Sequence, residues 1–326
     1  MNEPNAAALA GWIPYKLSVR EAVLQCMWLY TGDQRYTAPF FDETVSACLQ
    51  LPENSGKFRS ASSPEMLTHW PASINAVAPS AFIFHVSRCG STLFAQLLGL
   101  PEQHIVLAEV PFLDALLRIP FGNLPVQEAA IPALFNGALR FYGQQRRGDE
   151  THLFVKCDSW HLCFYRELRQ LYPTVPFILL YRSPDEVIQS QRRRRGMQSV
   201  QGVIEPGVFG FDETAILDLS LDDYMALVLE RYFRIMLEVA ADDPHSVLVN
   251  YREPVLSTID KIAALTRMKV SDQYRTQMEE RSRFHAKYPQ QVFQEPAADE
   301  SLPESVQPVM LLYEELDALR IQRRTL

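Results

Sequence analysis

The sequence lacks the cysteine pairs and the long apolar runs that mark several large classes of protein. Its five cysteines contain no CxxC pair and are odd in number, which argues against a disulfide framework or a zinc site and fits a reducing cytosol. No apolar run approaches the ~20 residues that a membrane-spanning helix needs. Residues 1–16 lack the basic start and the continuous apolar core of a signal peptide. We therefore expect a cytoplasmic protein without a membrane span.

The chain also lacks an excess of basic residues. It carries 31 lysines and arginines against 39 aspartates and glutamates, for a net charge of −8. A nucleic-acid-binding surface is normally basic, so nucleic acid is not expected as a partner. Hydrophobic residues make up 47% and charged residues 21% of the 326 residues, which is typical of a globular protein with a full core.

The most informative segment is 82–98, which reads FIFHVSRCGSTLFAQLL. An apolar run is followed by a short polar loop and then by an amphipathic run, the pattern of a strand, a tight turn and the start of a helix. A helix N-terminus that follows such a loop directs backbone N–H groups and the helix dipole at one point, which makes an anion site. Six loop residues are candidates to hold a phosphate-like group: Ser87, Arg88, Cys89, Gly90, Ser91 and Thr92.

This loop lacks the lysine of a nucleoside-triphosphatase loop. That motif reads GxxxxGK[ST], whereas Gly90 stands directly before Ser91 and no glycine lies five residues earlier. Cys89 is not followed by five residues and an arginine, so a cysteine-phosphatase loop is excluded as well. The pattern indicates a phosphate loop of another kind, with no expected metal.

A second polar junction lies at residues 176–190, PFILLYRSPDEVIQS. A buried-type strand ends at Arg182, and Pro184 then opens a helix at a position that proline favours. Ligands of open α/β sheets bind at the carboxyl ends of the strands, which is where Arg182 is placed. Arg182 is therefore a second candidate anion ligand.

Together, SRCGST and RSPDEVIQS resemble the two cofactor motifs of the sulfotransferase superfamily, and the resemblance covers about residues 80–270. It implies the donor 3′-phosphoadenosine 5′-phosphosulfate (PAPS), with the loop 87–92 on the 5′-phosphosulfate. Arg182, Ser190 and Arg194 would hold the 3′-phosphate; Arg194 is expected one helical turn beyond Ser190, on the same face. Arg192, Arg193 and Arg195 are read as solvent-facing or substrate-side. Ser87, Cys89, Ser91 and Ser183 depart from the usual motif residues.

The resemblance also implies a base and charge-stabilising groups for transfer to a hydroxyl or amine. Glu109, at the end of a short strand, resembles the family's base, and Lys156 and Arg88 would act on the developing charge. His85 and His161 are alternative bases. The segment 282–289 resembles the family's C-terminal cofactor loop through Ser282 and Lys287.

Apolar strands at 82–86, 105–108, 152–156, 177–181 and 247–251 alternate with helical stretches, which predicts an α/β fold. We expect a P-loop-type parallel sheet with helices on both faces over residues 79–326. Residues 1–78 are expected to form a small, mainly helical cap, with helices at 19–30 and 43–51. Residues 197–221 lack a clear period and are expected to form a mobile loop over the site.

Two other functions remain open at this point. One is a P-loop kinase or phosphotransferase, and the other is a non-catalytic protein that binds PAPS or its product. The acceptor is expected to be a small molecule, and phenols, alcohols, sugars and peptide tyrosines all remain open. Aromatic residues in 112–150 and 197–221 favour a hydrophobic acceptor, although core packing explains them equally well. Oligomeric state cannot be read from the sequence.

Overall fold

The computed structural model describes residues 6–21, 23–57, 59–284, 286 and 301–324. The chain divides into two compact units, each built from segments that are distant in sequence. Unit 1 comprises Met1–Ser80, Ala95–Lys156 and Gln170–Pro173, and unit 2 comprises Ala81–Phe94, Cys157–Arg169 and Thr174–Leu326. Within the described residues, no helix is long and apolar enough to cross a bilayer.

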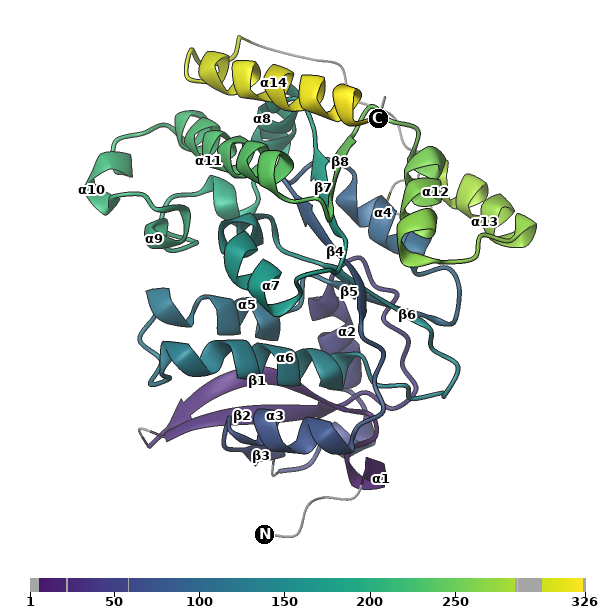
Figure 1. Ribbon diagram of the computed structural model, residues 1–326. Coiled ribbons are helices and arrows are strands. Elements are labelled where there is room, and N and C mark those ends of the chain that lie inside the picture. Colours follow the sequence, from purple (N-terminus) through teal and green to yellow (C-terminus); the bar gives the residue numbers. More distant parts are fainter. Residues whose placement is uncertain (1–5, 22, 58, 285, 287–300, 325–326) are drawn as a thin grey trace. The chain divides into compact units, whose positions relative to one another are not determined.

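The parallel strands form one five-stranded sheet in the order β5-β6-β4-β7-β8 (Figure 1). Their bounds are β4 (Pro79–His85), β5 (His104–Ala108), β6 (His152–Lys156), β7 (Phe177–Tyr181) and β8 (Ser246–Asn250). The pairs β5–β6, β4–β7 and β7–β8 are parallel. Four of these strands lie within a residue of the ranges expected from the apolar runs, and β4 begins three residues earlier than expected, so the predicted α/β sheet is confirmed.

Helices connect these strands, as parallel pairing requires. The longer ones are α4 (Ser91–Leu98), α5 (Pro111–Leu117), α6 (Ile131–Tyr142), α7 (Tyr165–Leu171), α8 (Pro184–Arg193), α11 (Leu221–Asp242), α12 (Val255–Thr266), α13 (Asp272–Ser282) and α14 (Val306–Arg324). Two short helices, α9 (Pro206–Phe209) and α10 (Glu213–Ile216), interrupt the segment that was expected to be an irregular loop. Phe209 and Ile216 are buried, so this segment is anchored to the core of unit 2.

The N-terminal region differs from the mainly helical cap that was expected. It contains the antiparallel sheet β1 (Trp12–Arg20), β2 (Val23–Tyr30) and β3 (Ala61–Ser62), with α1 (Ala6–Leu9), α2 (Phe41–Cys48) and α3 (Met66–His69). The helix predicted at 19–30 is wrong, whereas α2 confirms the helix predicted at 43–51.

The hairpin is explained by an alternation of buried and less buried residues along β2. This alternation is hard to see in the sequence, because most residues of β2 are apolar. Leu24, Cys26 and Trp28 are buried on one face of the strand, which is the alternation of a half-buried strand. Trp28 also packs edge-on against Phe141 of α6, with ring centroids 4.6 Å apart. Burial against a distant helix thus outweighs local helix propensity.

The compact units do not coincide with the division expected between residues 78 and 79. In unit 1, both α5 and α6 pack against β1, and α3 packs against α6. A Cβ on Gly137 of α6 would stand 1.8 Å from the carbonyl oxygen of Leu67, so α3 and α6 are in direct backbone contact. The N-terminal residues therefore share a core with residues 95–156.

In unit 2, the helix α14 is joined to the ends of β7 and β8 by a polar network. Tyr181, the last residue of β7, donates to Asp317 at 2.7 Å, and Asn250, the last residue of β8, donates to the same oxygen at 2.8 Å. Arg320 forms an ion pair with Asp317 at 2.7 Å. Although partial burial opposes it, these donors lower the pKa of Asp317 to about 2.

We expect Asp317→Asn to lower the stability of the protein at neutral pH by about 1–3 kcal/mol, because charge-assisted hydrogen bonds are lost. The depressed pKa means that the carboxylate stabilises the fold above its unfolded pKa of about 4 and loses this effect as the pH falls toward 2. Urea unfolding at pH 7 and at pH 2.5 should therefore show a difference between the variant and the wild type that shrinks at low pH. An equal difference at both values would contradict this assignment.

Candidate active site

The loop between β4 and α4 has an unusual backbone. Ser87 and Arg88 have φ angles of 68° and 51°, and Gly90 has a φ of 76°. Left-handed conformations cost non-glycine residues about 1–2 kcal/mol each. A loop that keeps two such residues in succession is stabilised by its surroundings, and strain of this kind is concentrated at ligand-binding sites.

Positive φ angles are rare in the part of the chain that the structure describes. Five non-glycine residues adopt them, and three of the five are predicted site residues: Ser87, Arg88 and Glu109. The other two have ordinary explanations, since Glu21 lies between β1 and β2 and Arg267 ends α12 in a left-handed cap. The backbone strain thus coincides with the segments that the sequence indicates.

The helix α4 begins at Ser91, at the end of this loop. The N–H of Phe94 donates to the Gly90 carbonyl at 3.1 Å, which is the first hydrogen bond of the helix. The N–H groups that precede it, on residues 91–93, belong to the first turn, where no intrahelical acceptor exists. These N–H groups and the helix dipole are the features from which the sequence predicts an anion site.

Arg182 follows β7 directly and lies against this loop in unit 2. Its guanidinium donates to the Arg88 carbonyl at 3.1 Å and to Glu186 at 2.9 Å. The guanidinium carbon also lies 4.2 Å from the centre of the Tyr251 ring. Three groups therefore fix the orientation of the Arg182 guanidinium.

Further contacts join the two motifs, which lie about ninety residues apart in sequence. Val86 and Cys89 both donate to the Leu180 carbonyl, at 3.2 and 3.6 Å. Gln191 donates to the Ser87 hydroxyl at 3.2 Å, and the Arg88 guanidinium donates to the Arg194 carbonyl. The structure thus brings the loop 87–92 and Arg182 together in one cluster, which we call the loop cluster.

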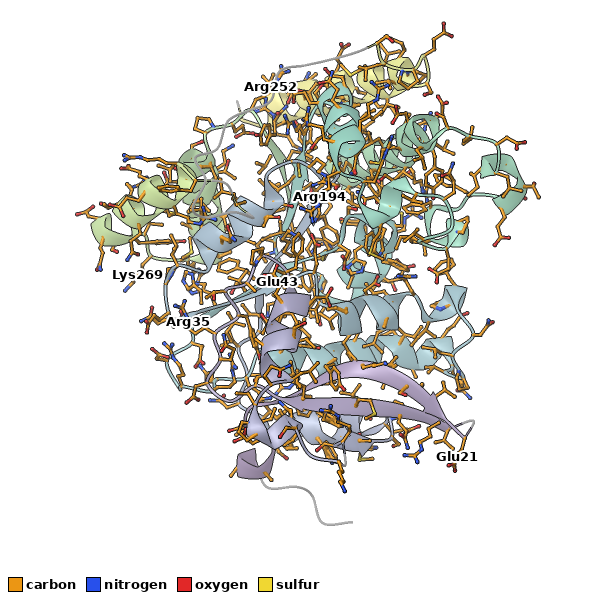
Figure 2. All side chains as sticks on the ribbon, turned by 180° about the vertical axis from the view of Figure 1, so that it is seen from behind. Glu21, Arg35, Glu43, Arg194, Arg252 and Lys269 are labelled. Carbon is orange, nitrogen blue, oxygen red and sulfur yellow. The ribbon has the colours of Figure 1, made fainter. Side chains whose placement is uncertain are left out.

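Arg194 departs from its expected position. The helix α8 ends at Arg193, and Arg194 has extended backbone angles of −155° and 103°. Its N–H still donates to the Ser190 carbonyl at 3.3 Å, but the side chain does not continue the helical face of Ser190. The helix ends here because Gly196 follows and Gln191 accepts the N–H of Gly196 at 2.8 Å. Figure 2 labels the exposed Arg194 side chain.

The neighbouring arginines have structural partners. Arg192 and Arg195 both pair with Asp222 of α11, at 2.6 and 2.5 Å, and Arg193 is exposed. Arg193 thus faces solvent, as one of the two expectations for these arginines had it, whereas Arg192 and Arg195 join α8 and the chain after it to α11. Arg252, also labelled in Figure 2, lies beyond β8 and makes a longer contact of 3.4 Å with Glu186.

In unit 1, Glu109 and Lys156 form an ion pair with each other. They lie at the carboxyl ends of the paired strands β5 and β6, and the N–H of Glu109 donates to the Lys156 carbonyl at 2.9 Å. The Lys156 side chain is buried, and one-fifth of the Glu109 side chain is exposed. A buried ammonium that is neutralised by a partly exposed carboxylate leaves the carboxylate as the group that an acceptor can approach.

Two residues beside the Glu109–Lys156 pair were not predicted from the sequence as site residues. The Phe40 ring centre lies 5.5 Å from the Lys156 ammonium, and Asp42 lies close enough to Glu109 to be affected by its charge. Partial burial and then the negative charge of Glu109 raise the pKa of Asp42. Both residues precede or begin α2, and no motif in the sequence marks them.

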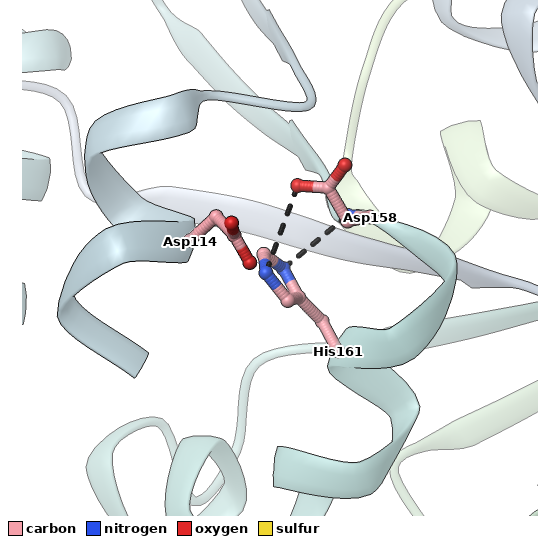
Figure 3. Close-up of side chains that lie close together, drawn as sticks. All are labelled: Asp114, Asp158 and His161. Atoms are coloured by element: carbon pink, nitrogen blue, oxygen red, sulfur yellow. Dashed lines mark hydrogen bonds and ion pairs between the residues drawn. The ribbon is translucent and has the colours of Figure 1, made fainter. Parts of the chain in front are cut away.

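The two alternative bases are occupied by structural hydrogen bonds. His85 is buried; its Nδ1 accepts the N–H of Ser87 at 3.0 Å, and its Nε2 lies 2.9 Å from the Cys157 carbonyl. His161 is buried and accepts the N–H of Asp158 at 3.2 Å in a capping box (Figure 3). Asp114, also drawn there, pairs with Arg118 in unit 1. Of the three candidate bases, Glu109 is the one whose side chain is partly exposed.

Most of the aromatic residues that favoured a hydrophobic acceptor belong to the core. Phe112, Phe135, Phe141, Tyr142 and Phe209 are each at most 2% exposed. Core packing therefore explains these five residues, whereas Phe121 is exposed.

The segment 282–289 was expected to resemble a cofactor loop through Ser282 and Lys287. The Ser282 hydroxyl donates to the Glu279 carbonyl at 2.8 Å, and Lys287 lies outside the described residues.

No family model and no curated protein matches this sequence. Among solved structures, the chain is similar to a sulfotransferase from Mycobacterium tuberculosis H37Rv, with 15% identity and a TM-score of 0.42 over 66% of this chain and 76% of that one. It is also similar to the sulfotransferase domain of the curacin biosynthetic pathway, with 15% identity and a TM-score of 0.48 over 74% and 99% of the two chains. A third is the sulfotransferase domain of the Synechococcus PCC 7002 olefin synthase, with 17% identity and a TM-score of 0.38 over 74% and 96%.

All three structures are sulfotransferases, the superfamily that the two motifs resemble. Likenesses this distant carry no argument about the activity of this chain. That argument rests on the loop cluster and on the Glu109–Lys156 pair.

The loop cluster predicts a specific role for Gly90. A Cβ at this position would stand 3.2 Å from the Tyr251 ring, on a residue whose φ is already 76°. We expect Gly90→Ala to lower affinity for adenosine 3′,5′-bisphosphate at least tenfold, because the loop must move to relieve the crowding. Gly148→Ala is the matched control, since Gly148 has a φ of 85° and open space around it. Equal affinities of the two variants in isothermal calorimetry would contradict this role.

Proposed function

We propose that this protein is a sulfotransferase that transfers a sulfuryl group from PAPS to a hydroxyl or amine of a small-molecule acceptor. The observation that carries the proposal is the hydrogen bond from Arg182 to the Arg88 carbonyl. It places a fixed cation beside a strained loop that opens a helix. Two anion sites at the ends of neighbouring parallel strands match a ligand with two separate phosphate groups.

The residues present fit the two charged ends of PAPS. The loop 87–92 offers first-turn N–H groups and the hydroxyls of Ser91 and Thr92 for the 5′-phosphosulfate. Arg182 offers a guanidinium held by Glu186, and Ser190 offers a hydroxyl for the 3′-phosphate. Arg194 is a weaker candidate, because its side chain leaves the face of α8.

The cosubstrate supplies the sulfuryl group, and the chain supplies charge and proton transfer. In this proposal, Arg88 and Lys156 stabilise the negative charge that develops on the leaving phosphate. Glu109 accepts the proton of the acceptor hydroxyl, and its ion pair with Lys156 holds its carboxylate in place.

The kinase alternative is disfavoured by the loop, which has no lysine at the position that contacts the β- and γ-phosphates of ATP. The non-catalytic alternative predicts a site with anion ligands and no base. The partly exposed carboxylate of Glu109, on a residue with a φ of 57°, favours an enzyme instead.

The assignment of Arg182 predicts that Arg182→Ala lowers affinity for adenosine 3′,5′-bisphosphate roughly 10- to 100-fold, because charge-assisted phosphate contacts are lost. Arg192→Ala is the matched control, since Arg192 of α8 pairs with Asp222 of α11. Calorimetric titration in EDTA measures both affinities. Unchanged binding by Arg182→Ala would refute the 3′-phosphate assignment. Binding of ATP only with Mg²⁺, and of no bisphosphate, would favour the kinase.

The assignment of Glu109 predicts that Glu109→Gln lowers turnover about 10²- to 10⁴-fold, because general base catalysis contributes that much. Affinity for the bisphosphate should stay within about threefold of the wild type, since Glu109 is not assigned to its phosphates. Glu43→Gln in α2, which removes an exposed carboxylate from the same unit, is the control. Transfer from ³⁵S-labelled PAPS to a panel of phenols, alcohols and sugars measures turnover. Normal turnover by Glu109→Gln would place the base elsewhere.

A further inference from the structure

Two buried polar side chains hold the loop 87–92 through hydrogen bonds to Ser87. His85 is 4% exposed, and its Nδ1 accepts the N–H of Ser87 at 3.0 Å. Gln191 is fully buried, and its amide donates to the Ser87 hydroxyl at 3.2 Å. One group thus holds the backbone of Ser87 and the other holds its side chain.

Each of these side chains is itself fixed by a second hydrogen bond. The Nε2 of His85 lies 2.9 Å from the Cys157 carbonyl, so it carries the proton and donates, which leaves Nδ1 as the acceptor for Ser87. The amide oxygen of Gln191 accepts the N–H of Gly196 at 2.8 Å, directly after the end of α8. His85 therefore anchors the loop to the chain beyond β6, and Gln191 anchors it to the helix that carries Ser190.

The backbone of the loop requires such anchors. Ser87 and Arg88 both adopt left-handed angles that non-glycine residues disfavour, and such angles persist only when neighbouring groups impose them. The carbonyl of Arg88 is also the acceptor for Arg182. A change in the angles of Ser87 would therefore displace the loop, whereas Arg182 is also held by Glu186 and by the Tyr251 ring.

We propose that His85 and Gln191 are positioning residues that hold the loop 87–92 in the conformation that binds the 5′ anion of the cosubstrate. The identity of that anion rests on the proposed function. The restraint of the loop by His85 and Gln191 is independent of it. His85 thus has a role different from that of a base: its ring remains neutral and passes no proton to or from a substrate.

His85→Gln and His85→Asn form a matched pair that tests this inference. The amide nitrogen of Gln reaches the position of Nε2 and can donate to Cys157, but it leaves Ser87 without an acceptor. The amide oxygen of Asn stands where Nδ1 stands and can accept from Ser87. Asn loses the bond to Cys157 but keeps the one to Ser87, so we expect His85→Asn to hold the loop more firmly than His85→Gln does.

The first readout is amide hydrogen exchange of residues 85–92 in the ligand-free protein. We expect His85→Gln and Gln191→Met to speed exchange roughly tenfold in this peptide, because one stabilising hydrogen bond to Ser87 is lost. The control Gln189→Met, two residues earlier on α8, should exchange as the wild type does, and His85→Asn should exchange more slowly than His85→Gln. Equal exchange in all four variants would overturn the inference, as would equal acceleration in the two His85 variants.

The second readout is calorimetric affinity for adenosine 5′-monophosphate and adenosine 3′-monophosphate. We expect His85→Gln to weaken binding of the 5′-phosphate at least tenfold and to leave binding of the 3′-phosphate unchanged, a split that general destabilisation would not produce. Equal loss for both ligands would overturn the positioning role. If the wild type binds neither nucleotide while the exchange contrast holds, the proposed cosubstrate fails and the restraint of the loop by His85 stands.

Discussion

The hydrogen bond between the Arg182 guanidinium and the Arg88 carbonyl depends on the parallel pairing of β4 with β7. Their register aligns His85 with Leu180, so both strands end at the same edge of the sheet. Each strand is then followed by a helix that begins within a few residues. The carboxyl ends of neighbouring parallel strands lie at the same edge of a sheet. The pairing of β4 with β7 is therefore sufficient to bring the loop 87–92 next to Arg182.

The surrounding structure reinforces this junction. Tyr251, the residue after β8, donates its N–H to the Tyr181 carbonyl at 2.8 Å and stacks on Arg182. The helix α14 ties the ends of β7 and β8 together through Asp317. These hydrogen bonds hold together the ends of β7 and β8, next to Arg182, whose guanidinium contacts the strained loop.

Much of the sheet and of the loop cluster could be predicted from the sequence, because buried parallel strands are continuous apolar runs and their polar ends are conspicuous. The hairpin at 12–30 could not, since its alternation is hidden in an apolar segment and is decided by packing of Trp28 on a distant helix. Arg194 was misplaced because the end of α8 depends on a side-chain contact from Gln191 to Gly196. The ion pair of Glu109 with Lys156 required the register of β5 and β6.

The most direct test of the account is a crystal structure of the protein with adenosine 3′,5′-bisphosphate. We predict that the 5′-phosphate lies against the N–H groups at the start of α4 and that the 3′-phosphate contacts Arg182 and Ser190. The torsion angles of Ser87 and Arg88 should remain in the left-handed region. A bisphosphate bound away from both segments, or a loop that refolds to ordinary angles around it, would contradict the claim that the two motifs form one preorganised site.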